Sequence, residues 1–124
     1  MIELTLPRPP SANRIWRIGN NKIHRSEEYR VWLRAAQWQI VAQAKRRKIE
    51  GRFKLTMIAI RPDRRRRDLD NLIKPTLDAL VKAEVVKDDT LCEWIEAYWA
   101  DPIEGKRIGN IIVTLEEVET DGEA

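Results

Sequence analysis

The segment that most restricts the fold is the apolar stretch RFKLTMIAI, residues 52–60. One face of this stretch carries only apolar side chains, those of Phe53, Leu55, Met57 and Ala59. The other face includes Ile58 and Ile60, so both faces are suited to burial. A strand of this kind is typical of the centre of a sheet. The stretch therefore predicts a sheet with neighbouring strands on both sides of it.

The N-terminal half predicts a strand, an irregular segment and a helix. Residues 1–6 alternate apolar and polar side chains, as a strand does, and the alternation ends at PRPP. Residues 11–25 are polar and basic and contain Gly and Asn, which predicts a long loop or a loose hairpin. Ser26 is a favourable N-cap for a helix that we expect to run to about Arg47, with Gly51 stopping it.

The C-terminal half predicts a second helix ending near Ala83, then strands at 93–99 and 107–115 joined by a turn at DPIEGK. The expected fold is α/β (α+β), with a small mixed sheet of about four strands and two helices packed on it. With 124 residues we expect a single domain, covering residues 1–115, and an acidic, frayed tail at 116–124.

Charge is unevenly distributed along the chain. Lys and Arg number 23 against 20 Asp and Glu, and the basic residues gather in the first two thirds of the sequence. A basic face of this kind favours an anionic partner, most simply a nucleic acid, although ordinary solvated charge explains it too. One cysteine, no signal-like start and no long apolar run predict a cytoplasmic protein without a membrane segment.

Four consecutive arginines, Arg64 to Arg67, stand directly before Asp68 and Asp70. Mg²⁺ takes oxygen ligands and keeps several waters, so one or two carboxylates can hold it. In an extended segment, residues two apart point to one face, so the two aspartates could share a cation. Two plainer explanations stay open: Asp70 caps a helix that begins near Asn71, and Asp68 pairs with an arginine.

The following helix places polar residues opposite an apolar stripe. Lys74 would lie about one turn from Asp70, where a cation could stabilise charge on a phosphate. The alternative is a solvated polar face with a Lys74–Asp78 ion pair. Pro75 lacks a backbone donor and restricts Lys74, so we expect either a distorted first turn or a regular helix that starts only at Pro75.

A second acidic pair, Asp88 and Asp89, follows the helix in VVKDDTL. Connections often carry catalytic groups, although for this pair taken alone a polar turn is the simpler explanation. Metal-assisted phosphodiester hydrolysis needs acidic ligands for the metal and positive charge near the phosphate. The chain offers both: Asp68, Asp70 and an aspartate from 88–89, with Lys74 and the arginine run beside them. The chain has one histidine, so a metal site must depend on carboxylates.

These residues resemble the motifs of a known protein family. RRRRDLDNLIKPTLDAL followed by KDD, with LPRPPSANR near the start, resembles the RusA family of Holliday junction resolvases. The resemblance implies a Mg²⁺-dependent homodimeric endonuclease, with Mn²⁺ as a possible substitute, that cuts four-way DNA junctions by paired, symmetric nicks. It implies no small-molecule cofactor. Members are typically bacterial or prophage proteins that act in recombination, repair or phage DNA processing.

The resemblance also implies roles for individual residues. Asp68, Asp70 and Asp89 would be the essential metal ligands, with Asp88 as the alternative to Asp89, and Lys74 would be the essential lysine. The expected DNA-binding residues are Arg64, Arg65, Arg66, Arg67, Asn71, Asn13, Arg14, Trp16 and Arg17. The chain departs from the family at Glu84, where members commonly carry a glycine suited to a left-handed helix end.

The tryptophans offer further interpretations. Trp16, between arginines, could stack on an exposed base or be half-buried. Trp32 and Trp38 on the long helix are expected in core or dimer packing. Trp94 and Trp99 fall on opposite faces of one strand, which predicts one core residue and one interface residue.

Three other functions compete with a junction resolvase. One is a nucleic-acid-binding module without catalysis, which would need no acidic cluster. Another is a metal-dependent nuclease acting on flap or branched DNA. The third is an inactive dimeric structural protein, which would show no response to metal.

Overall fold

A computed structural model of the chain describes residues 1–10, 16–19, 22–102 and 109–119. The elements in chain order are β1 (Ile2–Leu6), β2 (Trp16–Gly19), β3 (Lys22–Arg25), α1 (Glu27–Ala44), β4 (Phe53–Ile60), the 3₁₀ helix η2 (Leu69–Leu72), α2 (Ile73–Lys82), the 3₁₀ helix η3 (Asp89–Leu91), β5 (Cys92–Ala100) and β6 (Ile111–Glu117). Among the described helices, none is both long and apolar enough to cross a membrane.

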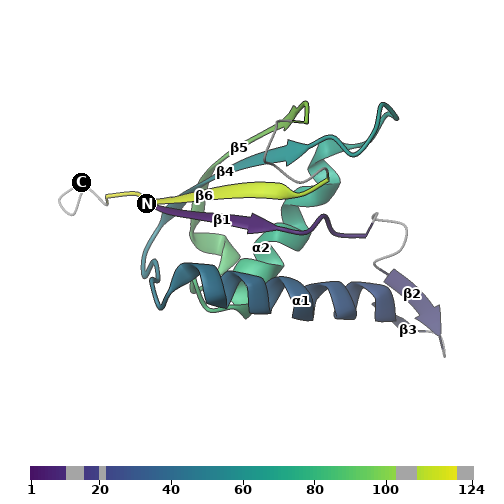
Figure 1. Ribbon diagram of the computed structural model, residues 1–124. Helices are drawn as coiled ribbons and strands as arrows, with labels where there is room; N and C mark the ends of the chain where they lie inside the picture. Colours follow the sequence, from purple (N-terminus) through teal and green to yellow (C-terminus); the bar gives the residue numbers. More distant parts are fainter. Residues whose placement is uncertain (11–15, 20–21, 103–108, 120–124) are drawn as a thin grey trace.

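The main sheet has four strands in the order β1-β6-β4-β5 (Figure 1). β4 pairs antiparallel with β6 and parallel with β5, so the sheet is mixed and β4 lies inside it, as predicted. β5 and β6 are consecutive in the chain but are not neighbours, because β4 lies between them. The expected mixed sheet with two helices is therefore confirmed.

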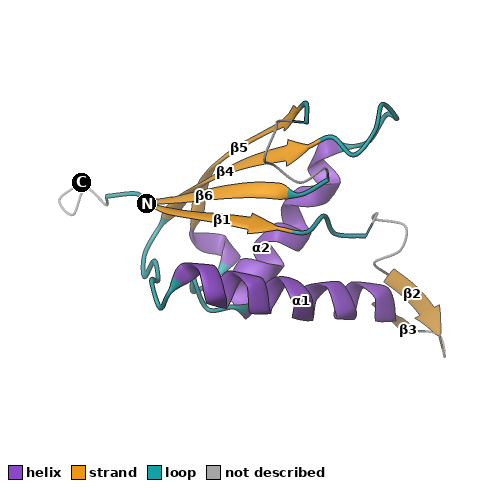
Figure 2. Cartoon of the chain, in the orientation of Figure 1, coloured by secondary structure: helices purple, strands orange, loops and turns teal. Residues whose placement is uncertain are grey.

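One face of the sheet forms the core together with α1 and α2 (Figure 2). Its side chains form three rows across the strands: Ile2, Leu115, Leu55 and Ile95; Leu4, Val113, Met57 and Ala97; Leu6, Ile111, Ala59 and Trp99. Ile95, at the β5 edge of the first row, lies outside the core and is exposed. The opposite face of β4 carries Lys54, Thr56 and Ile58, which are only partly buried, and Ile60, which is buried. The prediction that both faces of this strand are buried is therefore confirmed at Ile60 and wrong for the rest of the second face, and the strand is central because it pairs on both edges.

α1 begins as predicted and ends early. Ser26 caps it, with its Oγ accepting a hydrogen bond from the Tyr29 backbone N–H at 3.1 Å. Lys45 and Arg46 both adopt left-handed conformations, with φ of 52° and 69°, and these break the helical hydrogen-bond pattern. The Arg47 guanidinium then donates to the carbonyl of Ala44 at 2.8 Å. The helix thus ends three residues before the predicted Arg47, and Gly51 does not stop it.

The segment 11–25 contains a hairpin, β2 with β3, at the N-terminal end of α1 (Figure 1). The last strand, β6, begins at Ile111 rather than near Arg107 and runs to Glu117. It therefore extends two residues into the expected tail, and Glu117 pairs with Phe53. Residues 107–108 and 120–124 lie outside the described part of the chain.

The tryptophans divide between core and surface. Trp32 is buried, stacks on Tyr29 and donates from its Nε1 to the Pro7 carbonyl at 3.0 Å. Trp38, on the same helix, is exposed. On β5, Trp99 packs partly buried against the core and Trp94 is exposed, so their predicted opposite faces are confirmed.

Candidate active site

The chain enters the site region through an irregular helix start. Asp68 is extended and precedes η2, whereas Leu69 and Asp70 already lie within this 3₁₀ turn. The extended-segment argument for Asp68 and Asp70 is therefore wrong, because two-residue periodicity stops at Asp68. The distorted first turn is confirmed: the missing donor of Pro75 leaves a 3₁₀ turn, with the Ile73 N–H donating to Asp70, before the regular helix.

The Asp68 and Asp70 side chains are exposed, and their carboxylates have no side-chain partner among the described residues. Asp68 occupies the N-cap position of η2 without a side-chain capping bond, and no side-chain cap is present at the start of α2. Within the part of the chain that the structure describes, neither carboxylate has an ion pair with an arginine. Leu69, between them, packs against the core. Capping and arginine pairing therefore do not explain these two aspartates.

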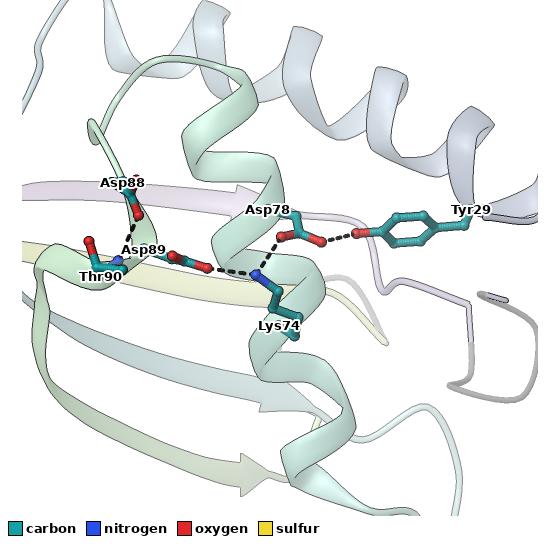
Figure 3. Close-up of polar contacts among 6 residues, drawn as sticks. All are labelled: Tyr29, Lys74, Asp78, Asp88, Asp89 and Thr90. Carbon is teal, nitrogen blue, oxygen red and sulfur yellow. Dashed lines mark hydrogen bonds and ion pairs between the residues drawn. The ribbon is translucent and has the colours of Figure 1, made fainter. Parts of the chain in front are cut away.

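Lys74, on the first turn of α2, lies between two carboxylates (Figure 3). Its Nζ is 2.6 Å from Oδ2 of Asp89 and 3.1 Å from Oδ1 of Asp78. The hydrogen bond with Asp89, and then that with Asp78, raises the pKa of Lys74 above its usual value. The ammonium therefore stays protonated at neutral pH.

Asp78 has a second partner that sequence reasoning missed. The Tyr29 hydroxyl, from α1, donates to Oδ2 of Asp78 at 2.7 Å (Figure 3). The two residues are 49 positions apart, and Tyr29 appears in the sequence only as one more apolar position of its helix. No local pattern in the sequence indicates this contact.

The two residues of the second acidic pair are used differently. Asp88 is the N-cap of η3, and its Oδ1 accepts from the Thr90 backbone N–H at 2.9 Å. This hydrogen bond is the main reason that the pKa of Asp88 is lowered. Asp89 instead points to Lys74 (Figure 3). Asp88, Asp89 and Asp78 share a hollow of about 410 Å³ beside α2.

The arginine segment borders a larger hollow of about 700 Å³. Its charged and polar lining is Arg8, Glu28, Asp63, Arg65, Arg66, Arg67, Asp68 and Asn71. Asp63 organises the loop, since it accepts from the Arg67 guanidinium at 2.7 Å and from the Arg65 backbone N–H at 2.9 Å. These two hydrogen bonds lower the pKa of Asp63, with Arg67 the larger cause. Arg64, Arg65 and Arg66 are exposed.

Arg8 is a basic residue of this hollow that the sequence prediction missed. Its Nη1 and the Nε of Arg67 are buried donors that have no hydrogen-bond partner among the residues the structure describes. Burial lowers the pKa of Arg8, and the nearby positive charge of Arg67 lowers it further. Two guanidinium groups with unmet donors in one hollow suit an anion such as a phosphate. The only hint in the sequence is a basic residue within PRPP, directly after a strand.

The remaining predicted DNA-binding residues belong to the early segment. Asn13 and Arg14 lie outside the described residues. Trp16 and Arg17 are on β2, of which the structure describes the backbone only. Asn71, in contrast, lines the arginine-bordered hollow together with Asp68.

The carboxylates suit a hard divalent cation by their chemistry, because all of them offer oxygen donors. Asp68 and Asp70 have no competing side-chain partner in the described part of the chain, whereas Asp89 is occupied by Lys74. Among the described residues, no three acidic, His or Cys side chains are grouped closely enough to form a ready-made metal site. A cation shared by Asp68, Asp70 and Asp89 would therefore draw these side chains closer together.

Comparison with known proteins identifies similar sequences along most of the chain. Residues 7–116 match the family model described as Endodeoxyribonuclease RusA. A crossover junction endodeoxyribonuclease of Enterobacteria phage HK97 is 35% identical over 117 residues, covering 94% of this chain and 97% of the relative. The Aquifex aeolicus protein of that name is 33% identical over 103 residues, covering 83% and 80%. The protein of Escherichia coli K12 is 40% identical over 87 residues, covering 69% and 72%.

Proposed function

The chain belongs to the RusA family of endodeoxyribonucleases, and on this premise we propose that it is a crossover junction endodeoxyribonuclease. Its substrate would be the four-way DNA junction, cut by paired, symmetric nicks. The observation that carries the proposal is the family match over residues 7–116, which includes the arginine segment, η2, α2 and η3 without interruption.

The acidic residues supply the chemistry. Asp68, Asp70 and Asp89 would hold Mg²⁺, or Mn²⁺ in its place, and the bound metal would polarise a phosphate oxygen and acidify a water ligand. The family resemblance favours Asp89 over Asp88 as a ligand, and Asp89 points toward Lys74 on α2 whereas Oδ1 of Asp88 caps η3. Lys74 carries a positive charge beside Asp89, where it would stabilise negative charge that develops on the phosphate.

The basic residues bind the DNA backbone. Arg64 to Arg67 would contact phosphates that flank the cut, which raises affinity without reading the bases. Arg8 supports the same role from another element, since its Nη1 is a buried donor in the hollow that Arg67 lines. A phosphate oxygen placed there would accept hydrogen bonds from both groups and neutralise their mutual repulsion.

The proposed enzyme is a homodimer, so that two sites act on opposed strands of a junction that is itself nearly two-fold symmetric. β5 supports this part of the proposal. It is an edge strand of the main sheet and exposes the large apolar side chains of Trp94, Ile95 and Tyr98. Apolar side chains gathered on one edge are typical of a protein interface. Sedimentation equilibrium should give twice the chain mass; a monomer at the concentrations that support cleavage would contradict it.

The test is cleavage of labelled DNA by the purified chain. A four-way junction, a flap and a matched linear duplex are each incubated with Mg²⁺ and with EDTA. We expect symmetric nicks in the junction alone, lost in EDTA. Asp70→Asn should keep junction binding and abolish cleavage, whereas Asp101→Asn, an exposed aspartate paired with Arg61, should cut like the wild type.

The other outcomes assign other functions. Tight junction binding without cleavage under any divalent metal would leave a nucleic-acid-binding module. Preferential cutting of the flap would indicate a nuclease of another substrate class. Cleavage retained by Asp70→Asn would refute the ligand assignment.

A further inference from the structure

A chain of polar contacts runs from the core to the surface at α2 (Figure 3). It begins at the Tyr29 hydroxyl on α1, which donates to Oδ2 of Asp78 at 2.7 Å. The other oxygen of Asp78 lies 3.1 Å from the Lys74 ammonium, which lies 2.6 Å from Asp89. Residues of three elements, α1, α2 and η3, are thus linked through Asp78 and Lys74.

Exposure increases along this chain of contacts. Tyr29 is only 1% exposed, the Asp78 side chain 16% and the Lys74 side chain 66%. Tyr29 is further anchored because its ring stacks on Trp32 in the core. The carboxylate of Asp78 is therefore held by a rigid part of the molecule, whereas Lys74, by itself, would be a long, flexible side chain in water.

An ordinary lysine–aspartate pair on a helix would not place an ammonium reliably. Such pairs are weak when exposed, and a lysine four residues before the acid is the less favourable orientation. Here the acid is largely buried and one of its oxygens is already fixed by Tyr29. Little side-chain freedom of Asp78 is left to lose when Lys74 binds, so this pair can hold the lysine in one place.

We propose that Asp78, oriented by Tyr29, is a positioning residue that holds the Lys74 ammonium beside Asp89. This inference rests on the proposed function, because it assigns Asp78 to the reaction through Lys74. In this proposal Asp78 acts through Lys74 rather than by contacting the metal or the DNA. The competing explanation is purely structural: Asp78 accepts a hydrogen bond from a buried hydroxyl and affects only folding.

A readout that does not need cleavage tests the contact directly. In metal-free protein labelled with ¹⁵N-lysine, an ammonium held by two carboxylates should exchange slowly with water and give a resolved NMR cross-peak. Lys74→Met identifies that peak by its loss. We expect Asp78→Asn to broaden or remove it and Tyr29→Phe to weaken it. A wild-type-like peak in Asp78→Asn would overturn the proposal.

Cleavage then tests the functional consequence. We expect Asp78→Asn to lower kcat by about 10- to 100-fold, the usual loss when a residue supporting a reactive group is removed, with KM little changed. Tyr29→Phe should give a smaller loss of the same kind, and Asp78→Glu should recover part of the rate. Asp101→Asn again serves as the control.

The decisive comparison is made in the Lys74→Met background. If Asp78 acts through Lys74, adding Asp78→Asn should cause no further loss of rate. If the rate losses of the two substitutions multiply in the double variant, the proposal is overturned. Urea unfolding of every variant shows whether a lower rate comes only from a smaller amount of folded protein. If the wild type cuts no junction, the proposed function fails, while the NMR result still decides whether Asp78 holds Lys74.

Discussion

The end of α2 offers a quantitative test of backbone strain, at Glu84. The Glu84 N–H donates to the Val81 carbonyl at 2.9 Å and the Val85 N–H to the Leu80 carbonyl at 3.1 Å. This is the Schellman pattern, and it requires a left-handed residue after the helix. Glu84 has a φ of 61°, and Val85 and Leu80 are both buried, as the motif favours. The glutamate thus occupies a conformation that suits glycine.

The expected gain from Glu84→Gly follows from two opposing terms. The left-handed conformation costs a residue with a Cβ about 1–2 kcal/mol. Glycine also gives the unfolded chain more conformational freedom, which favours unfolding by about 0.4–1 kcal/mol and offsets part of this gain. The net stabilisation is therefore about 0.5–1 kcal/mol. With 124 residues and an unfolding entropy of about 2.1 cal/mol/K per residue, this raises the Tm by roughly 2–4 °C.

Calorimetry and urea unfolding measure the change, with Glu84→Ala as the matched control. Alanine removes the charged side chain but keeps the Cβ, so it should show none of the gain. An alanine variant as stable as the glycine variant would refute the strain argument, since the effect would then belong to the side chain. Junction cleavage should be unaffected in both, because Glu84 contacts neither Lys74 nor the acidic residues in the described structure.

Three further predictions concern the basic hollow and the core. Arg8→Ala should weaken junction binding about equally for all DNA sequences and lower the slope of log affinity against log salt by about 1, as measured by titration at several salt concentrations. Leu80→Ala, at a fully buried position, should cost about 2–5 kcal/mol in urea unfolding; a smaller cost would mean that the site collapses around the cavity. Asp63 stabilises the fold above its ordinary pKa of 3.8, and this contribution should be lost as the pH falls through its lower folded-state pKa, because protonation weakens the contacts with Arg67 and Arg65. The difference in unfolding free energy between wild type and Asp63→Asn should therefore shrink below pH 3.8, and a difference that stays constant there would contradict the assignment.

Local patterns in the sequence were sufficient to predict several of the elements and the motif. The apolar stretch 52–60 predicted the inner strand, Ser26 the start of α1 and Pro75 the irregular start of α2. Each of these depends on the chemistry of a few neighbouring residues. The arginines, DLDN, Lys74 and KDD, taken in order, predicted the family, which the match over residues 7–116 confirms.

Where the sequence misled, a distant contact or a competing local conformation decided. α1 ends at Ala44 because two residues turn left-handed and Arg47 closes the last turn. The strand order was not predicted: β6 lies between β1 and β4 rather than beside β5, and such an order depends on pairing between segments far apart in the chain. Period-two spacing suggested that Asp68 and Asp70 share a face, but the 3₁₀ turn at Leu69 interrupts it.

The sequence by itself determined which residue types are present and in which order: the basic run, the four aspartates and the lysine of the motif. Only the tertiary structure decided how they are used. Packing of α1 on α2 brings Tyr29 to Asp78 across 49 residues, and the return of the chain through η3 brings Asp89 rather than Asp88 to Lys74. Side-chain position depends on which surfaces the core brings together, and no spacing within a single helix or loop records that.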